Sequence, residues 1–168
     1  MNGDGASIYT CDGTYLNSYA LPSVALQQFD SDPARHPRAI CHDGTYVYTL
    51  NSEGSVRKFD KATMTLVDSS PAMPAGTITE YQQIILASGM LYFTAHDGKV
   101  RRLDPDNFAG GYTVLDLAHQ LEGVAYTAGN LYVTDFDGGI TIVDTDTFTI
   151  VSRTDFSATY LPTRIIAA

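Results

Sequence analysis

The stretch LYVTDFDG at residues 131–138 carries a tyrosine in a run of apolar and β-branched residues that ends in an acidic residue and a glycine. Related stretches occur three times earlier, as IYTCDG at 8–13, VYTLNSEG at 47–54 and LYFTAHDG at 91–98. The tyrosines are 39, 44 and 40 residues apart, at Tyr9, Tyr48, Tyr92 and Tyr132. A period near 40 residues indicates that the chain is built from copies of one supersecondary unit.

Each repeat is predicted to contain short strands joined by tight turns. The second repeat divides into RAICH, YVYTLN, SVRKF and MTLVDS, separated by DGT, SEG and DKAT, and the third and fourth repeats divide in the same way. Asp-Gly and Glu-Gly between such runs are strong hairpin signals, because glycine accepts the positive φ that these turns need. An aspartate twelve residues after three of the tyrosines is expected to close the third hairpin by accepting backbone N–H bonds two residues on: Asp60, Asp104 and Asp144. The pattern predicts an all-β fold of four-stranded antiparallel blades, which is a β-propeller.

The four repeats are expected to form a single domain over residues 1–168. The first repeat lacks an obvious first strand, and TRIIAA at 163–168 has the character of one, so we expect it to pair with SIYT at 7–10. Joining Ala168 to Met1 would place Tyr9 45 residues after Tyr132, close to the other spacings. We favour a four-bladed ring within one chain, closed by this strand, because closure within a chain has the higher effective concentration. Two chains forming an eight-bladed ring, or a piece cut from a longer propeller, are the alternatives.

The fourth repeat resembles a known family of repeats. LYVTDFDGGITIVDTDTFTIVSR at 131–153 is similar to the YVTN type of β-propeller repeat, and LEGVAYTAGNLYVTD at 121–135 also resembles NHL-type repeats. The resemblance implies a propeller, and such families include lactone hydrolases, a streptogramin lyase, surface proteins and binding scaffolds. Their propellers have six to eight blades, so a chain of four repeats departs from the pattern. In the first repeat, Tyr19 and Pro22 replace the aspartate and threonine of the third turn.

Composition limits the classes of partner. The formal net charge is -9, and the ten Lys and Arg are scattered, which argues against binding to a phosphate backbone. No run of about 18 apolar residues exists, so no membrane-spanning segment is predicted. The amino-terminal sequence has no signal-peptide pattern, and the sequence assigns no compartment.

Four polar residues are expected at the mouth of a central channel, because each stands where an inner strand opens: Arg38, Gln82, Glu122 and Arg164. A concave mouth lined by every blade is where a propeller is expected to bind ligands. The two arginines favour a small anionic ligand there. In lactonase-type propellers, which the repeats resemble, a glutamate such as Glu122 is a metal ligand. The two neighbouring cations would repel a metal ion, so neither a metal nor a cofactor is predicted.

Further candidates lie in the turns of the same face. Three histidines and four turn carboxylates are expected around one mouth: His36, His96, His119, Asp12, Glu53, Asp97 and Asp137. Acidic-Gly pairs are required by the hairpins themselves, so a structural role is favoured over a ring of metal ligands. Nucleophile and phosphate-binding motifs are absent from the sequence. Cys11 and Cys41 are expected toward opposite faces, both as free thiols.

The sequence therefore favours a non-enzymatic binding scaffold. Its partner is expected to be a small anionic ligand or a protein at the channel face, with no nucleic acid and no membrane, and the chain is expected to be a monomer or a homodimer. The alternative is a lactonase-like or lyase-like enzyme with a metal site at the channel mouth, so the sequence leaves the question of enzymatic activity open.

Overall fold

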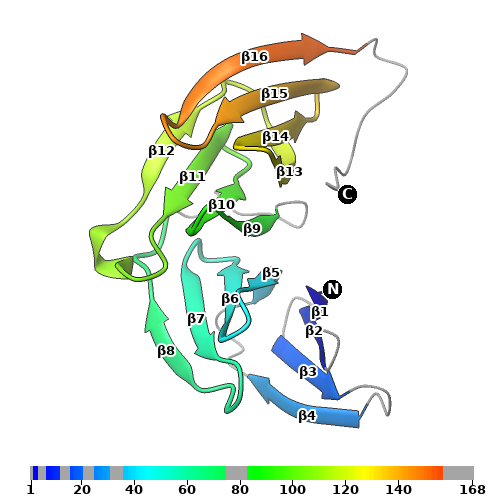
Figure 1. Ribbon diagram of the computed structural model, residues 1–168, viewed down its shortest axis with the longest axis vertical. Helices are drawn as coiled ribbons and strands as arrows, with labels where there is room; N and C mark the ends of the chain where they lie inside the picture. Colours follow the sequence, from blue (N-terminus) through cyan, green and yellow to red (C-terminus); the bar gives the residue numbers. More distant parts are fainter. Residues whose placement is uncertain are drawn as a thin grey trace. The chain divides into compact units, whose positions relative to one another are not determined.

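The computed structural model describes residues 36–74 and 83–156 in full, and before them the backbone of strands at 2–3, 7–11, 16–20 and 25–30. The chain forms two compact units, Met1–Ile78 and Thr79–Ala168, and each contains two four-stranded antiparallel sheets. In every sheet the strands follow one another in chain order (Figure 1). These sheets confirm the predicted all-β fold of consecutive meanders.

The first unit contains two sheets. The first sheet consists of β1 (Asn2–Gly3), β2 (Ser7–Cys11), β3 (Leu16–Ala20) and β4 (Ala25–Asp30). The second sheet consists of β5 (Pro37–His42), β6 (Tyr46–Asn51), β7 (Val56–Asp60) and β8 (Leu66–Ser69).

The second unit repeats this pattern. Its first sheet consists of β9 (Ile84–Ala87), β10 (Met90–Thr94), β11 (Lys99–Leu103) and β12 (Thr113–Asp116), with a 3-10 turn, η1 (Phe108–Gly110), before the last strand. Its second sheet consists of β13 (Leu121–Thr127), β14 (Asn130–Asp135), β15 (Gly139–Asp144) and β16 (Thr149–Asp155). No helix among the residues described is long and apolar enough to cross a membrane.

The first sheet differs from expectation at its inner edge. The two-residue strand β1 pairs with β2 there, with Asn2 opposite Tyr9 and Gly3 opposite Ile8. The first repeat thus has a short first strand of its own, which pairs antiparallel with the second. Residues 163–168, which were expected at this edge, lie outside the described residues, so their pairing stays a prediction.

The second hairpin of each fully described repeat has the same geometry. Its glycine has a positive φ, of 85° at Gly54, 80° at Gly98 and 84° at Gly138. Each glycine carbonyl accepts a backbone N–H from the segment that leaves the fourth strand of the same sheet, from Met73 at 3.2 Å, Leu117 at 2.9 Å and Phe156 at 2.9 Å respectively. The hairpin turn and the connection to the next repeat are therefore fixed to one another.

The third hairpins confirm the role predicted for the repeated aspartate. The Asp60 carboxylate accepts the backbone N–H of Thr63 at 2.8 Å and its hydroxyl at 2.9 Å. Asp144 does the same with Thr147, and both carboxylates also accept a backbone N–H two positions on, from Ala62 and Asp146, as expected. Asp104 bonds two residues on, to the backbone N–H of Asp106 at 2.9 Å. Because the Thr63 and Thr147 bonds favour the ionised form, they lower the pKa of Asp60 and Asp144.

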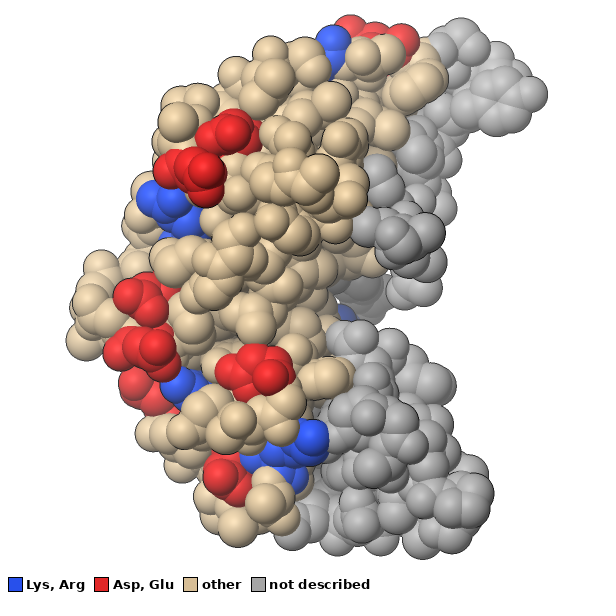
Figure 2. Space-filling model, in the orientation of Figure 1, with Lys and Arg blue, Asp and Glu red and all other residues tan. Residues whose placement is uncertain are grey.

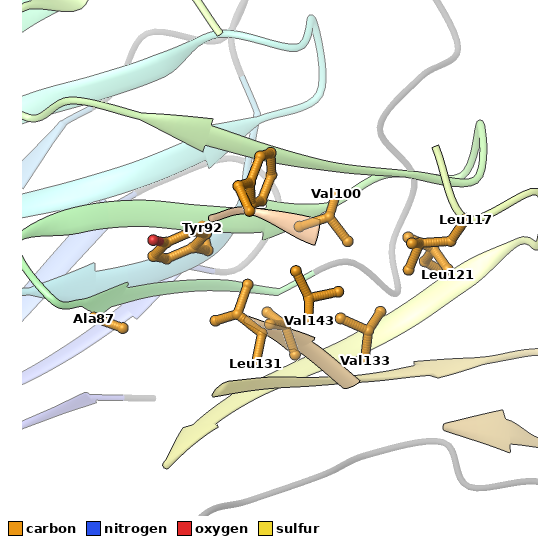
Figure 3. Close-up of a cluster of buried hydrophobic side chains, with 10 residues drawn as sticks. Ala87, Tyr92, Val100, Leu117, Leu121, Leu131, Val133 and Val143 are labelled. Carbon is orange, nitrogen blue, oxygen red and sulfur yellow. The ribbon is translucent and has the colours of Figure 1, made fainter. Parts of the chain in front are cut away.

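The two sheets of the second unit pack face to face through one apolar cluster (Figure 3). The β9–β12 sheet supplies Ala87, Tyr92 and Val100, and the β13–β16 sheet supplies most of the other buried members: Leu121, Val124, Leu131, Val133, Val143 and Phe148. Val100, Leu131, Val133 and Val143 are fully buried. Each large side chain buried in this way contributes about 1.5–3 kcal/mol.

Polar and aromatic contacts join the same two sheets. The Tyr92 ring lies 6.0 Å from the Phe148 ring, and its hydroxyl donates to the Thr145 carbonyl at 3.4 Å. The Arg102 guanidinium lies 4.7 Å from the Phe148 ring centre and also donates to Thr145. Burial raises the pKa of Tyr92, although Arg102 acts in the opposite direction. The repeated tyrosine thus links its own sheet to the third hairpin of the next one.

The β5–β8 sheet of the first unit has a smaller cluster, formed by Ile40, Val47, Phe59 and Met64. Cys41 is a buried free thiol, as expected, and burial followed by the charge of Asp43 raises its pKa strongly. A thiol held in the neutral form is a poor nucleophile. The side chain of Cys11 lies outside the described part.

Three of the four outer strands carry a β-bulge against the third strand of their sheet. The register shifts between Ser18 and Tyr19, between Lys58 and Phe59, and between Ile142 and Val143. The extra residues in the outer strands include Val67 and Val151, which are 51% and 60% exposed. Bulges disrupt the ladder at a sheet edge and so limit pairing with other strands.

Replacing Gly98 with alanine is expected to destabilise the protein more than the same change at Gly129. The two glycines have similar φ values, 80° and 82°, so both variants incur the left-handed penalty of about 1–2 kcal/mol. At Gly98 the added Cβ would also lie 2.9 Å from the His119 carbonyl oxygen, whereas nothing lies within 4 Å at Gly129. Urea unfolding should show an additional loss of about 1 kcal/mol or more for Gly98→Ala. Equal losses of stability in the two variants would mean that the segment containing His119 is not packed on the turn that contains Gly98.

Candidate functional site

Two of the four residues predicted at the channel mouth lie in the described part. Arg38 lies in β5 and Glu122 in β13, in separate compact units, so their meeting at one channel mouth stays a prediction. Gln82 and Arg164 lie outside the described residues. Arg38 and Glu122 share one local feature, because the register of each inner strand shifts at that point, between Pro37 and Ala39 and between Leu121 and Val124. Such bulges often redirect side chains next to functional sites.

The backbone around Glu122 is held by side chains from both sheets of the second unit. The Thr94 hydroxyl donates to the Glu122 carbonyl at 3.1 Å, and the Gly123 N–H donates to the Thr134 hydroxyl at 3.1 Å. The Val124 N–H donates to the side-chain oxygen of Gln83 at 3.0 Å. These bonds satisfy backbone groups that the bulge removes from the strand ladder, so the position of Glu122 is fixed.

The Glu122 side chain is a buried carboxylate. The residue is 4% exposed, and no described residue makes a hydrogen bond or an ion pair with its carboxylate. Burial, and next the negative charge of Asp135, raise its pKa. A buried acid with a raised pKa and no compensating partner among the described residues costs stability, and such acids are candidates for functional positions.

Asp135, at the end of β14, is the ionic centre of this region and was not predicted from the sequence. It is 1% exposed and accepts the backbone N–H groups of Asp137 and Gly139, each at 3.0 Å. Its other oxygen pairs with Arg153, which also bonds Asp155. Burial lowers the pKa of Arg153, but the bond and charge of Asp135 outweigh this effect and raise it. The second and third repeats have Asn51 and Ala95 at this position, so these repeats gave no signal for an ion pair.

The turn residues of the second unit divide into two pairs. The His119 ring nitrogen Nδ1 lies 2.8 Å from the Asp137 carboxylate, which joins the connection before β13 to the β14–β15 turn. Asp97 forms two bonds to Arg101, at 2.9 and 2.6 Å. Burial alone raises the pKa of Asp97, but the bonds and charge of Arg101, followed by Lys99, lower it below its ordinary value.

The structure places the other predicted turn residues as follows. The His96 ring lies 6.2 Å from the Phe136 ring, so two adjacent turns of the second unit meet there. His36 and Glu53 lie in the first unit, where the His36 carbonyl accepts the Ser52 N–H at 2.8 Å. Asp12 lies outside the described residues. The prediction that seven such residues surround one mouth therefore stays untested, except for the contacts within the second unit.

One group in the second unit has donor atoms close enough to hold a metal ion. The ligand atoms of His119, Asp135 and Asp137 lie within 4.8 Å of one another. Both oxygens of Asp135 already have partners, one of them the Arg153 guanidinium. A metal ion would have to compete with that fixed positive charge, so the group fits a hydrogen-bonded network better than a metal centre.

The charges on the visible surface are mixed. On the face drawn in Figure 2, Lys and Arg lie beside Asp and Glu, and the described residues of that view show no continuous basic patch. The expectation that the chain does not bind nucleic acid stays a prediction.

Comparisons with known proteins identify the fold. No protein family and no curated protein match the sequence. Among solved structures, the chain is similar to the WD40 repeats of RRP9, with a TM-score of 0.78 and 12% identity, over 92% of this chain and 47% of that one. It is also similar to the computationally designed Ika8 protein, with a TM-score of 0.69 and 14% identity, over 92% of this chain and 48% of that one. These similarities support a β-propeller repeat protein, and the chain spans about half the length of each.

Replacing Glu122 with glutamine is expected to raise the melting temperature at pH 7. Because the folded-state pKa is raised, the native protein binds more protons than the unfolded chain, and stability falls as pH rises from the ordinary glutamate range through the folded-state value. The variant lacks this loss, so the two proteins should melt at similar temperatures near pH 4 and diverge toward pH 7.

The matched control is Asp116→Asn, which removes an exposed charge of the same unit. Its difference from the parent should not follow the same pH dependence. A Glu122→Gln protein that is less stable than the parent at pH 7 would contradict the inference that the Glu122 carboxylate destabilises the folded protein.

Proposed function

We propose that this chain is a non-enzymatic β-propeller interaction scaffold of the YVTN/NHL repeat type. Its partner binds the face that carries the β10–β11 and β14–β15 turns and the connection before β13, which we call the loop face. The observation that carries the proposal is the fixation of this connection to both turns, because a binding surface is most effective when its loops are held by the scaffold.

The connection at residues 117–120 is tied at three points. The Leu117 N–H donates to the Gly98 carbonyl at 2.9 Å, and the Phe136 N–H donates to the Gln120 carbonyl at 2.9 Å. The His119–Asp137 bond is the third tie. A loop face fixed in this way can bind a partner with little loss of conformational entropy.

The chemistry of this face favours a basic segment of a partner protein. Asp137 is 66% exposed at the turn, and the Asp97 carboxylate remains 28% exposed beside Arg101. The net charge of -9 would also attract a basic partner over longer distances. A small anionic ligand bound by Arg38, Gln82, Glu122 and Arg164 at a channel mouth remains our hypothesis for a second ligand of the same scaffold.

The size of the ring is part of this proposal. The sequence favoured four blades in one chain, with two chains forming eight blades as the alternative. Similarity to about half of each propeller chain fits a ring larger than four blades, built either by two copies of this chain or by a longer propeller of which it is a piece.

A lactonase-like or lyase-like enzyme is the second candidate function. The raised pKa of Glu122 favours it, because a buried acid of this kind can act as a general acid or base. The argument against a metal-dependent form is the Arg153 charge on Asp135.

A yeast-displayed library of random 12-residue peptides tests the loop face. We expect selection against the purified protein to enrich Lys-containing and Arg-containing peptides, and Asp137→Asn to weaken the binding of selected peptides several-fold, by about 1 kcal/mol. The control is Asp146→Asn, which removes an exposed charge from the β15–β16 turn at the opposite end of β15 and should leave binding unchanged. Equal loss in both variants, or no basic enrichment, would contradict the proposed site.

Calorimetric titration with Ca²⁺, Mn²⁺ and Zn²⁺ separates the two functions. The scaffold is expected to show no tight binding of any of these ions, because Arg153 occupies the buried carboxylate that a metal ion would need. One ion bound with micromolar or higher affinity, and lost in Glu122→Gln, would favour the enzyme.

A further inference from the structure

The two faces of the β13–β16 sheet differ in how well they are covered. Leu131, Val133 and Val143 belong to the cluster that packs on the β9–β12 sheet. Tyr132 pairs across the strands with Ile142, so these two residues share the opposite face, and Ile140 joins them opposite Thr134. Tyr132, Ile140 and Ile142 are only partly buried. We call these three residues the open face.

The equivalent residues of the preceding repeat are the ones that pack on a neighbouring sheet. Tyr92 takes the place of Tyr132 and pairs with Arg102, and Val100 pairs with Thr94 in the place of Ile140. Tyr92 is 1% exposed and Val100 is fully buried, and both belong to the cluster shared with the β13–β16 sheet. One side of the repeat is therefore built to receive the next sheet of an array.

We propose that the open face of the β13–β16 sheet binds the β1–β4 sheet of a second copy of this chain. The proposal rests on the propeller proposed above and specifies the contact that joins the two copies. Within one chain, the β9–β12 sheet packs on the β13–β16 sheet. In the proposed contact, the open face of one copy packs in the same way on the β1–β4 sheet of the second copy. The interface continues the sheet-on-sheet packing already present in the second unit.

The strand register of the β1–β4 sheet is compatible with packing against the open face. Ile8 lies opposite Tyr19 in the β2–β3 pair, as Leu131 lies opposite Val143 in the β14–β15 pair. The β1–β4 sheet therefore has apolar or aromatic residues at the positions equivalent to Leu131 and Val143, which pack on the β9–β12 sheet. The match is one of register position, which the repeat spacing preserves.

A ring of the size of the two solved propellers needs more sheets than this chain has, and a second copy of the chain would supply them. The chain matches 47% and 48% of two propeller chains, so two copies supply the length of one. With two-fold symmetry, the open face of each copy would bind the first sheet of the other, and two identical interfaces would form. Apolar side chains left partly exposed in the single chain would then be buried.

Multi-angle light scattering over a concentration series tests the inference. The parent is expected at twice 18.2 kDa, dissociating only on dilution. Ile142→Asp is expected at 18.2 kDa, with dimerisation weakened roughly a hundredfold or more, because the dimer would bury an unpaired carboxylate. A parent that stays at 18.2 kDa at the highest concentration would show that the chain closes on itself and would overturn the proposal.

The matched control is Val151→Asp, the same apolar-to-acid change on the 60% exposed bulge of the same sheet. It should dimerise like the parent, and an Ile142→Asp protein that dimerises equally well would also overturn the proposal. Near-UV circular dichroism checks that both variants keep their packed tyrosines, and the parent mass is decisive even if Ile142→Asp does not fold. Peptide binding measured on the monomeric Ile142→Asp protein separates the two proposals, because the loop face does not depend on the second copy.

Discussion

The packing of one sheet face on the next is the interaction on which the rest of this structure depends. A four-stranded meander has two faces, and a sheet of this size has too little interior to be stable alone. In the second unit the need is met by Tyr92 and Val100 on one sheet and Leu131 and Val143 on the other. Hydrogen bonds from Tyr92 and Arg102 to the Thr145 carbonyl orient the two sheets, because they hold one sheet against the third hairpin of the next.

The loop face follows from a second constraint, the fixation of each hairpin turn by the segment that leaves its sheet. The turn glycines accept hydrogen bonds from these segments, so the chain passes to the next repeat along a defined path. Glu122 lies at the end of that path, where the inner strand opens with a bulge whose backbone is satisfied by Thr94, Thr134 and Gln83. A buried carboxylate is thus held in place where no described residue neutralises it and where burial and Asp135 raise its pKa, which costs stability.

Much of the fold could be predicted, because turn chemistry and strand periodicity act locally. The spacing of Tyr48, Tyr92 and Tyr132 located every strand of three repeats, and the acidic-Gly pairs located their hairpins. Asp60, Asp104 and Asp144 close the third hairpins through bonds within a few residues, which sequence alone can anticipate. The short strand β1 was missed, because a two-residue pairing has no periodicity to detect.

The sequence by itself determined the repeat, the all-β class and the positions of Arg38 and Glu122 at the start of β5 and β13, since each depends on neighbours along the chain. Only the tertiary structure decided which charges meet. Asp135 and Arg153 are 18 residues apart and pair because β14 and β16 flank the same strand, β15. His119 reaches Asp137 because a connection crosses a turn, and Glu122 has its raised pKa because burial brings its carboxylate under the influence of Asp135. Such pairings depend on register and on sheet packing, which no local pattern encodes.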